Sequence, residues 1–309
     1  MEFEPLVSVV LPSFNRERCI GRAARSVLAQ SYQKLELIIV DDGSTDNTAE
    51  VMKEIADNRV SYVRHDNNRG AAAARNTGIL HARGELLAFQ DSDDEWLLDK
   101  LTRQVEALSL AGDSIGAVFG GKILYGKDAS GRYGDRLTSH IPLENQTDLS
   151  GRITKPLMAR NFISPQTLLM RRYIAVELGG FDERLPCNED WDFMLRLSLV
   201  TKILCVSRPV VVAYISDDSL SLRRHSNVFS QLVVVRKFRS QFDANPRIYA
   251  RHLFRLGFNL SRMGKSKSGK LLVVKALAID PWSLRHWIGF LAVLFETLRR
   301  SVAVFGIRG

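Results

Sequence analysis

The sequence predicts an α/β protein with a mainly parallel mixed sheet flanked by helices, followed by a C-terminal α-helical extension. Two observations lead to this prediction. Before about residue 225, short apolar runs alternate with segments of helical periodicity, and beyond it only helical patterns occur. The net charge changes sign near the same place. We therefore expect one domain at residues 1–225 and a basic helical region at residues 226–309.

Strands are predicted from apolar, β-branched runs that end abruptly, the first at Pro12 and the second at Asp41. The predicted strands are residues 6–11, 35–40, 60–64, 85–90, 166–170, 202–206 and 209–214. Residues 126–160 are rich in Gly, Ser and Asp and are expected to form loops or short strands.

Helices are predicted from apolar residues spaced three and four apart. The predicted helices are residues 18–30, 45–56, 71–81, 96–110 and 189–200, followed by a helical pair at 247–263 and 270–279. Because buried strand runs separated by helices form βαβ units, the alternation predicts a mainly parallel sheet.

Composition is that of a globular protein. Of the 309 residues, 45% are hydrophobic and 25% charged, which argues against disorder. Three widely spaced cysteines form neither a disulfide framework nor a CxxC metal site, so we expect a reducing, cytoplasmic location. No apolar run approaches the roughly 20 residues of a membrane span, and the start of the chain lacks the basic residues of a secretory signal.

The charge is distributed unevenly. Residues 221–309 contain 17 Lys and Arg against 3 Asp and Glu, a net charge of +14, whereas residues 1–220 carry a net charge of −5. A basic segment can bind nucleic acid, anionic lipid or a phosphorylated substrate, or form a solvated helical surface. Charge alone does not choose among these.

Acidic clusters follow two predicted strands, at residues 41–44 and 91–94. The carboxyl ends of parallel strands share one edge of a sheet, where ligands bind in open α/β folds. The first cluster can accept hydrogen bonds from a base or ribose, or form a turn and helix cap. The second has carboxylates two residues apart, which can hold one divalent cation or cap the following helix.

Two further charged positions have two interpretations each. Arg75, on the alanine-rich helix, can reach a phosphate or lie on the surface of a packed helix. Glu189 and Asp190 open a predicted helix, where they can supply a general base or simply be stabilised by the helix dipole. The six histidines show no paired zinc spacing.

Taken in order, these segments resemble the family 2 glycosyltransferases of bacterial type. The resembling stretches are residues 7–16, 26–32, 37–46, 69–78 and 91–94, with weaker similarity at 179–183 and 189–192. The resemblance implies a GT-A fold, which is a Rossmann-like mixed sheet flanked by helices.

The resemblance also implies roles for individual residues. Asp93 and Asp91 match the DxD motif that holds Mn²⁺ or Mg²⁺, with Asp93 as the more direct ligand. Asp190 matches the catalytic base, and Glu189 is its neighbour that contacts acceptor or supports the site. The implied nucleotide-binding residues are Pro12, Phe14, Asn15, Asp41, Asp42, Arg75, Asp91 and Ser92. Many members carry a metal-binding His after the last core strand, but here none occurs between Tyr214 and His225, so the third metal ligand is not assigned.

The implied activity is inverting transfer of a sugar from a nucleoside-diphosphate sugar to the hydroxyl of a saccharide or lipid-linked saccharide. Cell-envelope polysaccharide or lipid-linked oligosaccharide synthesis is the expected setting. Phe14 and Asp42 suit a pyrimidine base, which favours UDP or dTDP over GDP, and no nucleic-acid partner is expected. The alternatives are a nucleotide-sugar-forming nucleotidyltransferase and a non-catalytic nucleotide-binding or scaffold protein. A dinucleotide dehydrogenase is disfavoured because no GxGxxG follows the first strand.

The last segment, residues 282–309, has a helical apolar stripe. Its members are Leu284, Trp287, Ile288, Leu291, Leu294, Phe295, Leu298, Val302 and Phe305, while Arg285, Glu296, Arg299 and Arg300 lie off the stripe. The segment can lie on an anionic membrane, which would make the protein peripheral on the inner face of the cell membrane. Alternatively, the stripe can dock onto the catalytic domain or onto a second subunit.

Overall fold

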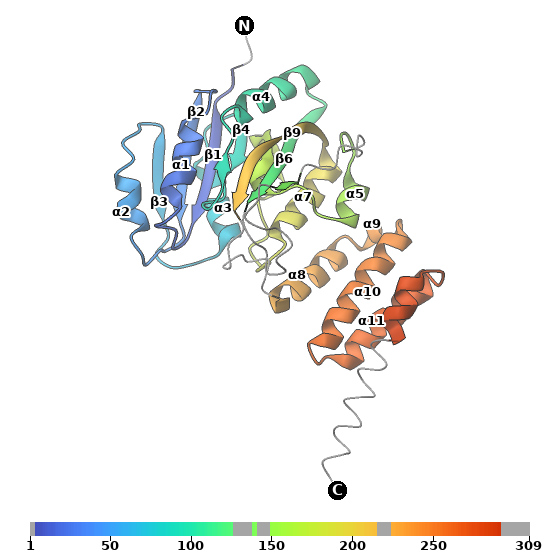
Figure 1. Ribbon diagram of the computed structural model, residues 1–309. Helices are drawn as coiled ribbons and strands as arrows, with labels where there is room; N and C mark the ends of the chain where they lie inside the picture. The colour runs from blue at the N-terminus through green and yellow to red at the C-terminus, as the bar shows by residue number, and fades with distance from the viewer. Residues whose placement is uncertain (1–3, 126–137, 141–148, 215–223, 292–309) are drawn as a thin grey trace. The chain divides into compact units, whose positions relative to one another are not determined.

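The computed structural model describes residues 4–125, 138–140, 149–214 and 224–291. The chain divides into two compact units, Met1–Ser219 and Leu220–Gly309 (Figure 1). Sequence patterning placed the division between residues 225 and 226. Each unit is described by itself below.

The first unit is built on a mixed sheet, to which nine strands contribute in the described residues, in the order β3-β2-β1-β4-β8-β6-β9-β5 with β7 beside β6. The strands are β1 Val7–Ser13, β2 Leu35–Asp41, β3 Val60–Arg64, β4 Leu86–Phe89, β5 Glu95–Trp96, β6 Ile115–Tyr125, β7 Thr138–His140, β8 Leu168–Arg171 and β9 Lys202–Tyr214. Strands β1 to β4 are parallel, and β8 is antiparallel to both β4 and β6. Strands β6 and β9 therefore run in the same direction as β1 to β4, which confirms the predicted α/β class with a mainly parallel mixed sheet.

Helices cover the sheet of the first unit. They are α1 Ile20–Leu28, α2 Thr48–Lys53, α3 Ala71–His81, α4 Lys100–Ala111, α5 Thr154–Ala159, α6 Arg172–Glu177 and α7 Glu189–Val200, with a 3-10 turn at Pro165–Thr167. Val7, Val9 and Leu11 of β1 share a buried cluster with α1, whereas Val10 meets Gly78 of α3. Because successive strand side chains point to opposite faces, α1 and α3 cover opposite faces of the sheet. This double coverage explains the continuous apolar runs of β1 and β2, which are buried throughout.

Strand β6 is a strand that the sequence reading missed. Its three glycines resemble breakers, yet two of them are required by close packing. A Cβ at Gly116 would lie 2.3 Å from Ile174 Cδ1, and one at Gly120 would lie 2.7 Å from Val210 Cγ1. A glycine inside a strand can thus mark close approach of a neighbour rather than a loop.

Several other boundaries differ from the prediction, among them the following three. Residues 202–214 form one strand instead of two, with a register irregularity against Gly120 and Gly121 that accommodates Pro209. Strand β1 continues through Pro12 to Ser13. The helix expected from residue 96 begins at Lys100, after the short strand β5. Within residues 126–160, β7 and α5 are described, and residues 126–137 and 141–148 lie outside the described part of the chain.

The second unit is helical as predicted. Its helices are α8 Arg224–Lys237, α9 Arg239–Asp243, α10 Pro246–Arg262 and α11 Ser266–Ile279, followed by a helical segment at residues 284–291. Helices α10 and α11 form the expected pair (Figure 1), and a Cβ at Gly257 of α10 would lie 2.6 Å from the carbonyl oxygen of Gly269 on α11. None of the helices in the described ranges is long and apolar enough to cross a membrane.

Replacing Gly78 by Ala tests the packing of α3 on the sheet. The new Cβ would lie 2.2 Å from Val10 Cγ1, so we expect a destabilisation of about 1–3 kcal/mol and a Tm lower by several degrees. The matched control is Gly21→Ala on α1, whose Cβ would lie 3.3 Å from its nearest neighbours, which are side-chain atoms of Arg25 and Val51. Thermal unfolding of both variants measures the difference. Equal Tm values would contradict the close contact.

Candidate active site

The candidate site lies at the edge of the sheet where β1, β2 and β4 end. Asp42, directly after β2, is 3% exposed and organises the loop that leads into α3. Its Oδ1 accepts the N–H of Arg69 at 2.9 Å and its Oδ2 accepts the N–H of Gly70 at 2.7 Å. His65 Nδ1 lies 2.7 Å from Asp42 Oδ1. The Asp42 carboxylate therefore fixes the start of the helix that carries Arg75.

Asp41, the last residue of β2, is fully buried and forms the turn predicted for residues 41–44. Its Oδ1 accepts the N–H of Ser44 at 2.8 Å, and its Oδ2 accepts the hydroxyl of Tyr62. Burial, the hydrogen bond to Asp41 and its charge raise the pKa of Tyr62. Both aspartates therefore hold a turn or the start of a helix in place, and a nucleoside contact by either remains a prediction.

The end of β1 carries the other predicted nucleoside-binding residues. Pro12 is buried within the strand, while the Phe14 side chain is 40% exposed. Asn15 has a left-handed backbone, with φ of 52°, and its Oδ1 accepts the N–H of Thr45 at 2.8 Å. This bond ties the end of β1 to the turn after β2. Phe14 is thus an exposed aromatic ring beside that turn, where a base could stack.

The acidic motif after β4 concentrates negative charge. Burial, together with the neighbouring Asp91, raises the pKa of Asp93. Burial and then Asp91 and Asp93 raise the pKa of Asp94 to about 8. Both oxygens of Asp94 are engaged, Oδ1 by the N–H of Tyr214 and Oδ2 by Gln166 Nε2, each at 2.9 Å. Asp94 therefore holds the motif to the end of β9, and Ser92, which is 8% exposed, lies buried within it.

Arg75 connects this motif to the acidic pair on α7. Its Nη2 donates to Asp91 Oδ1 and its Nη1 to Glu189 Oε1, both at 2.9 Å. The side chain is 8% exposed, so the alternative of a surface arginine is wrong. Burial alone would lower the pKa of Arg75, but the two carboxylates outweigh it and raise the pKa. One guanidinium thus pairs with two carboxylates that are 98 residues apart in the chain.

Asp190 is held by two hydrogen bonds at the start of α7. Its Oδ1 accepts the N–H of Trp191 at 2.7 Å and its Oδ2 accepts Asn161 Nδ2 at 2.9 Å. Burial and then the carboxylate of Glu189 raise the pKa of Asp190 to about 6, while Trp191 and Arg75 act in the opposite direction. A carboxylate with a pKa near 6 is deprotonated at neutral pH and is a stronger base than an ordinary aspartate.

The segment before α7 is fastened to α3 by Asn76. Its Oδ1 accepts the N–H of Phe181 at 2.7 Å and its Nδ2 donates to the Phe181 carbonyl at 2.9 Å. The ring of Phe181 stacks on Phe193 of α7, with centroids 4.3 Å apart. Gly180 is required there because a Cβ would lie 2.3 Å from Asn76 Oδ1. Consecutive residues of α3, Arg75 and Asn76, therefore bring α7 to the acidic motif.

Sequence reasoning missed two groups of residues that support the site. Asn161, in an irregular segment, carries no motif that would predict its contact with Asp190. Arg22 of α1 donates to the carbonyl oxygen of Asp93 at 2.8 Å, pairs with Glu95 at 2.8 Å and lies 4.0 Å from the ring centroid of Tyr214. These contacts join segments far apart in the chain, and no local pattern reports them.

The donor set of the acidic motif suits a hard divalent cation. Carboxylate oxygens are the ligands that Mg²⁺ and Mn²⁺ prefer, and the raised pKa values of Asp93 and Asp94 reflect burial first and then the neighbouring carboxylates, whose repulsion a cation would relieve. Among the residues that the structure describes, no group of three or more His, Cys, Asp or Glu is arranged to hold an ion. Asp91 and Asp93 would thus supply two ligands, which fits an ion that also binds water and phosphate. Residues 215–223 and the side chain of His225 lie outside the described part.

A family model described as glycosyl transferase family 2 matches residues 8–173. The chain belongs to this family. WfgD of Escherichia coli, named as a UDP-Glc:alpha-D-GlcNAc-diphosphoundecaprenol beta-1,3-glucosyltransferase, is 42% identical over 103 residues, which are 33% of this chain and 41% of that protein. The matched segments of such curated relatives span about two fifths of their length.

Solved structures of other glycosyltransferases share the fold. Residues 1–349 of TarS from S. aureus, in complex with UDP-GlcNAc, match with a TM-score of 0.58 and 19% identity, covering 96% of this chain and 91% of that one. The mannosyltransferase PcManGT from Pyrobaculum calidifontis, in complex with GDP-Man and Mn²⁺, matches with a TM-score of 0.60 and 19% identity, covering 97% and 88%. These similarities show the predicted GT-A fold.

Proposed function

We propose that this family 2 member transfers a sugar from a nucleoside-diphosphate sugar to an acceptor hydroxyl, with inversion at the anomeric carbon. The observation that carries the proposal is the Arg75 bridge, which joins the acidic motif to the α7 pair at 2.9 Å on each side. Within this arrangement, Asp190 has a pKa raised to about 6. A site for a diphosphate leaving group and a base for a hydroxyl are therefore adjacent.

The chemistry follows from the diphosphate site and the base. Asp190 would remove the proton of the acceptor hydroxyl as its oxygen attacks the anomeric carbon, while the bond from that carbon to the diphosphate breaks. A single base opposite the leaving group implies in-line displacement and hence inversion. Asp93 and Asp91 would hold Mn²⁺ or Mg²⁺, which when bound neutralises charge on the diphosphate. Arg75 would hold Asp91 and Glu189 in place.

The setting we propose is the synthesis of cell-envelope polysaccharide or lipid-linked oligosaccharide. The acceptor named for WfgD, a sugar-diphosphoundecaprenol, supports a saccharide or lipid-linked acceptor. The exposed ring of Phe14 beside the turn at Asp42 supports UDP or dTDP as donor nucleotide. A cytoplasmic protein that is peripheral on the inner face of the membrane would meet both substrates.

A thermal-shift panel with UDP, dTDP, GDP and CDP, each with and without Mn²⁺, tests the donor site. Ligand at a hundredfold excess over its Kd stabilises the native state by about 2.7 kcal/mol, so we expect the Tm to rise by about 5–10 °C with the correct diphosphate. Asp93→Asn should abolish the part of this shift that depends on Mn²⁺. The matched control, Asp113→Asn, changes an exposed aspartate that pairs with Arg171 and should shift like the wild type.

The outcomes of this panel separate the candidates. A shift with one diphosphate that requires Mn²⁺ supports the metal-assisted donor site and identifies the base. A shift with GDP alone overturns the proposed preference for a pyrimidine. No shift with any diphosphate at saturating concentration overturns the donor site and favours a non-catalytic role.

A further inference from the structure

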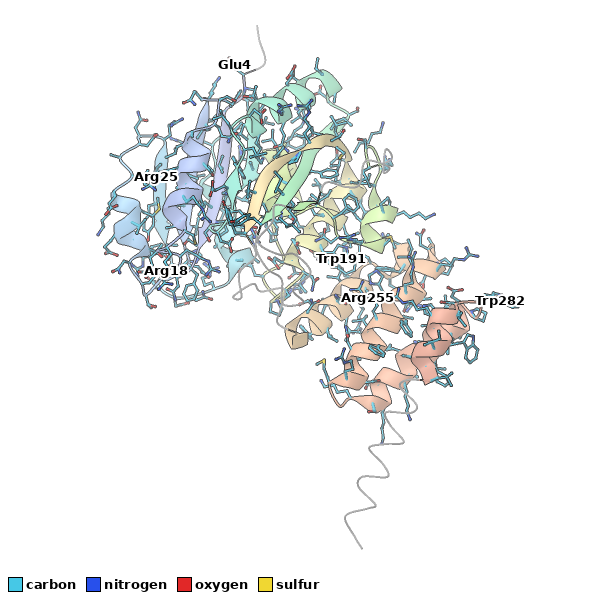
Figure 2. The ribbon with its side chains drawn as sticks, viewed as in Figure 1. Glu4, Arg18, Arg25, Trp191, Arg255 and Trp282 are labelled. Atoms are coloured by element: carbon cyan, nitrogen blue, oxygen red, sulfur yellow. The ribbon has the colours of Figure 1, made fainter. Side chains whose placement is uncertain are left out.

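The last described helix of the second unit presents its apolar stripe outward. Four of its residues are well exposed: Leu284 at 73%, Trp287 at 46%, Ile288 at 61% and Leu291 at 51%. Their spacing of three, four and seven residues places them on one side of the helix. Trp282, just before the helix, is 94% exposed and projects away from the helices of its unit in Figure 2.

The same helix packs on its own unit through a different side. His286 is 1% exposed and its ring lies 4.9 Å from that of Phe254 on α10. Gly289 is in the closest contact, since a Cβ there would lie 2.1 Å from Phe254 Cζ. The apolar stripe of residues 284–291 is therefore not the core face of this unit. The continuation of the stripe in residues 292–309 lies outside the described part of the chain.

Helix α11 repeats this arrangement. Leu271 is 63% and Val274 is 49% exposed, three residues apart on one side of the helix. Exposed cations flank these stripes, namely Lys267 and Lys275 on α11 and Arg285 on the last described helix. The whole stretch from 266 to 291 contains a single acidic residue, Asp280.

We propose that this apolar-basic face binds the surface of an anionic phospholipid bilayer. The exposed residues that would carry the binding are Trp282, Leu284, Trp287, Ile288 and Leu291 of the last described segment and Leu271 and Val274 of α11, together with Lys267, Lys275 and Arg285. None of the helices in the described residues is long and apolar enough to span a bilayer, and exposed Trp and Leu beside Lys and Arg are typical of helices that lie in its interface. The proposal concerns the second unit alone and does not require the proposed function.

Charge decides between a bilayer and a second copy of the chain. A second copy docked on this face would bring two strongly basic surfaces together, because residues 221–309 carry a net charge of +14. An anionic leaflet supplies the opposite charge, and each Lys or Arg near it adds to the attraction. The apolar residues then enter the boundary between headgroups and acyl chains.

Flotation of the full chain with vesicles tests the proposal. We expect co-flotation with vesicles of phosphatidylethanolamine containing one third phosphatidylglycerol, and little with phosphatidylcholine alone. The double variant Trp287→Glu and Ile288→Glu should lower partitioning by at least about tenfold, as should Lys267→Glu with Lys275→Glu. The matched control, Leu80→Glu with Leu110→Glu, changes two residues of the first unit that are 84% and 82% exposed and should float like the wild type.

Three results would overturn the proposal. The first is no flotation of the wild type. The second is equal flotation of the Trp287/Ile288 variant, which would assign binding to another part of the chain. The third is a dimer in sedimentation that this variant dissociates, which would make the face a contact between copies. Unchanged nucleotide-dependent thermal shifts in the same variant show that its first unit is intact, so a failure here is distinct from a failure of the donor site.

Discussion

Asp190→Asn is expected to lower the rate of sugar transfer by about 10²–10⁴-fold while leaving donor binding intact. The amide cannot accept the acceptor proton, yet it has the size of the carboxylate and can still accept the N–H of Trp191. The hydrogen bonds of Asp190 go to Trp191 and Asn161 rather than to the acidic motif, so the nucleotide-dependent thermal shift should match that of the wild type. Transfer assays at saturating donor, together with the shift assay, measure the two effects separately.

The pH dependence of kcat/KM for the wild-type enzyme provides an independent test of Asp190 as the base. The pKa of Asp190 is raised to about 6, and only the deprotonated carboxylate can accept a proton. We therefore expect kcat/KM to fall below pH 6 and to level off above it, where an unperturbed aspartate would still be ionised at pH 5. Asp113→Asn should keep this profile. Near-wild-type transfer by Asp190→Asn would remove Asp190 from the role, whatever the profile.

The sheet and the central acidic residues could be predicted because their signals are local. A buried strand is a continuous apolar run, and Asp41 and Asp91 follow such runs directly. Strand β6 was missed because Gly116 and Gly120 resemble loop residues until the neighbours Ile174 and Val210 are in place. Because glycine has no side chain, a single sequence does not indicate which neighbour packs closely against it.

The connections of the site were less predictable than its residues. Arg75 was singled out from its motif, but its burial between Asp91 and Glu189 depends on the fold bringing α7 to β4. The contact from Asn161 to Asp190 has no motif at all. Similarly, the periodicity of residues 284–305 predicts a stripe but not whether it faces a core. In the described residues, the helix packs on Phe254 through His286, so the stripe does not face the core of its unit.

Arg75→Met is expected to have the largest effect on stability, because it leaves two poorly solvated carboxylates without their cation. Removing one partner of a buried charge network destabilises a protein by about 3–5 kcal/mol. The Arg75 side chain is 8% exposed, and its partners Asp91 and Glu189 are 26% and 14% exposed, so we expect the lower end of that range. Urea-induced unfolding measures the loss. The matched control, Arg103→Met, removes a solvent-exposed pair with Asp99 and should unfold like the wild type.

The same substitution should move the pH profile, which a purely structural role would not do. The Arg75 cation opposes the rise in the pKa of Asp190, so without it that pKa should increase further and the acidic limb should shift above pH 6. Arg75→Lys is the variant to use if Arg75→Met does not fold, since it keeps the charge but cannot donate from two guanidinium nitrogens to both carboxylates. The Arg75→Lys variant should keep the acidic limb of the pH profile near pH 6 but have a lower kcat. An unshifted limb in a folded Arg75→Met protein would separate Arg75 from the base, whereas a shifted limb would establish that the Arg75 cation lowers the pKa of Asp190.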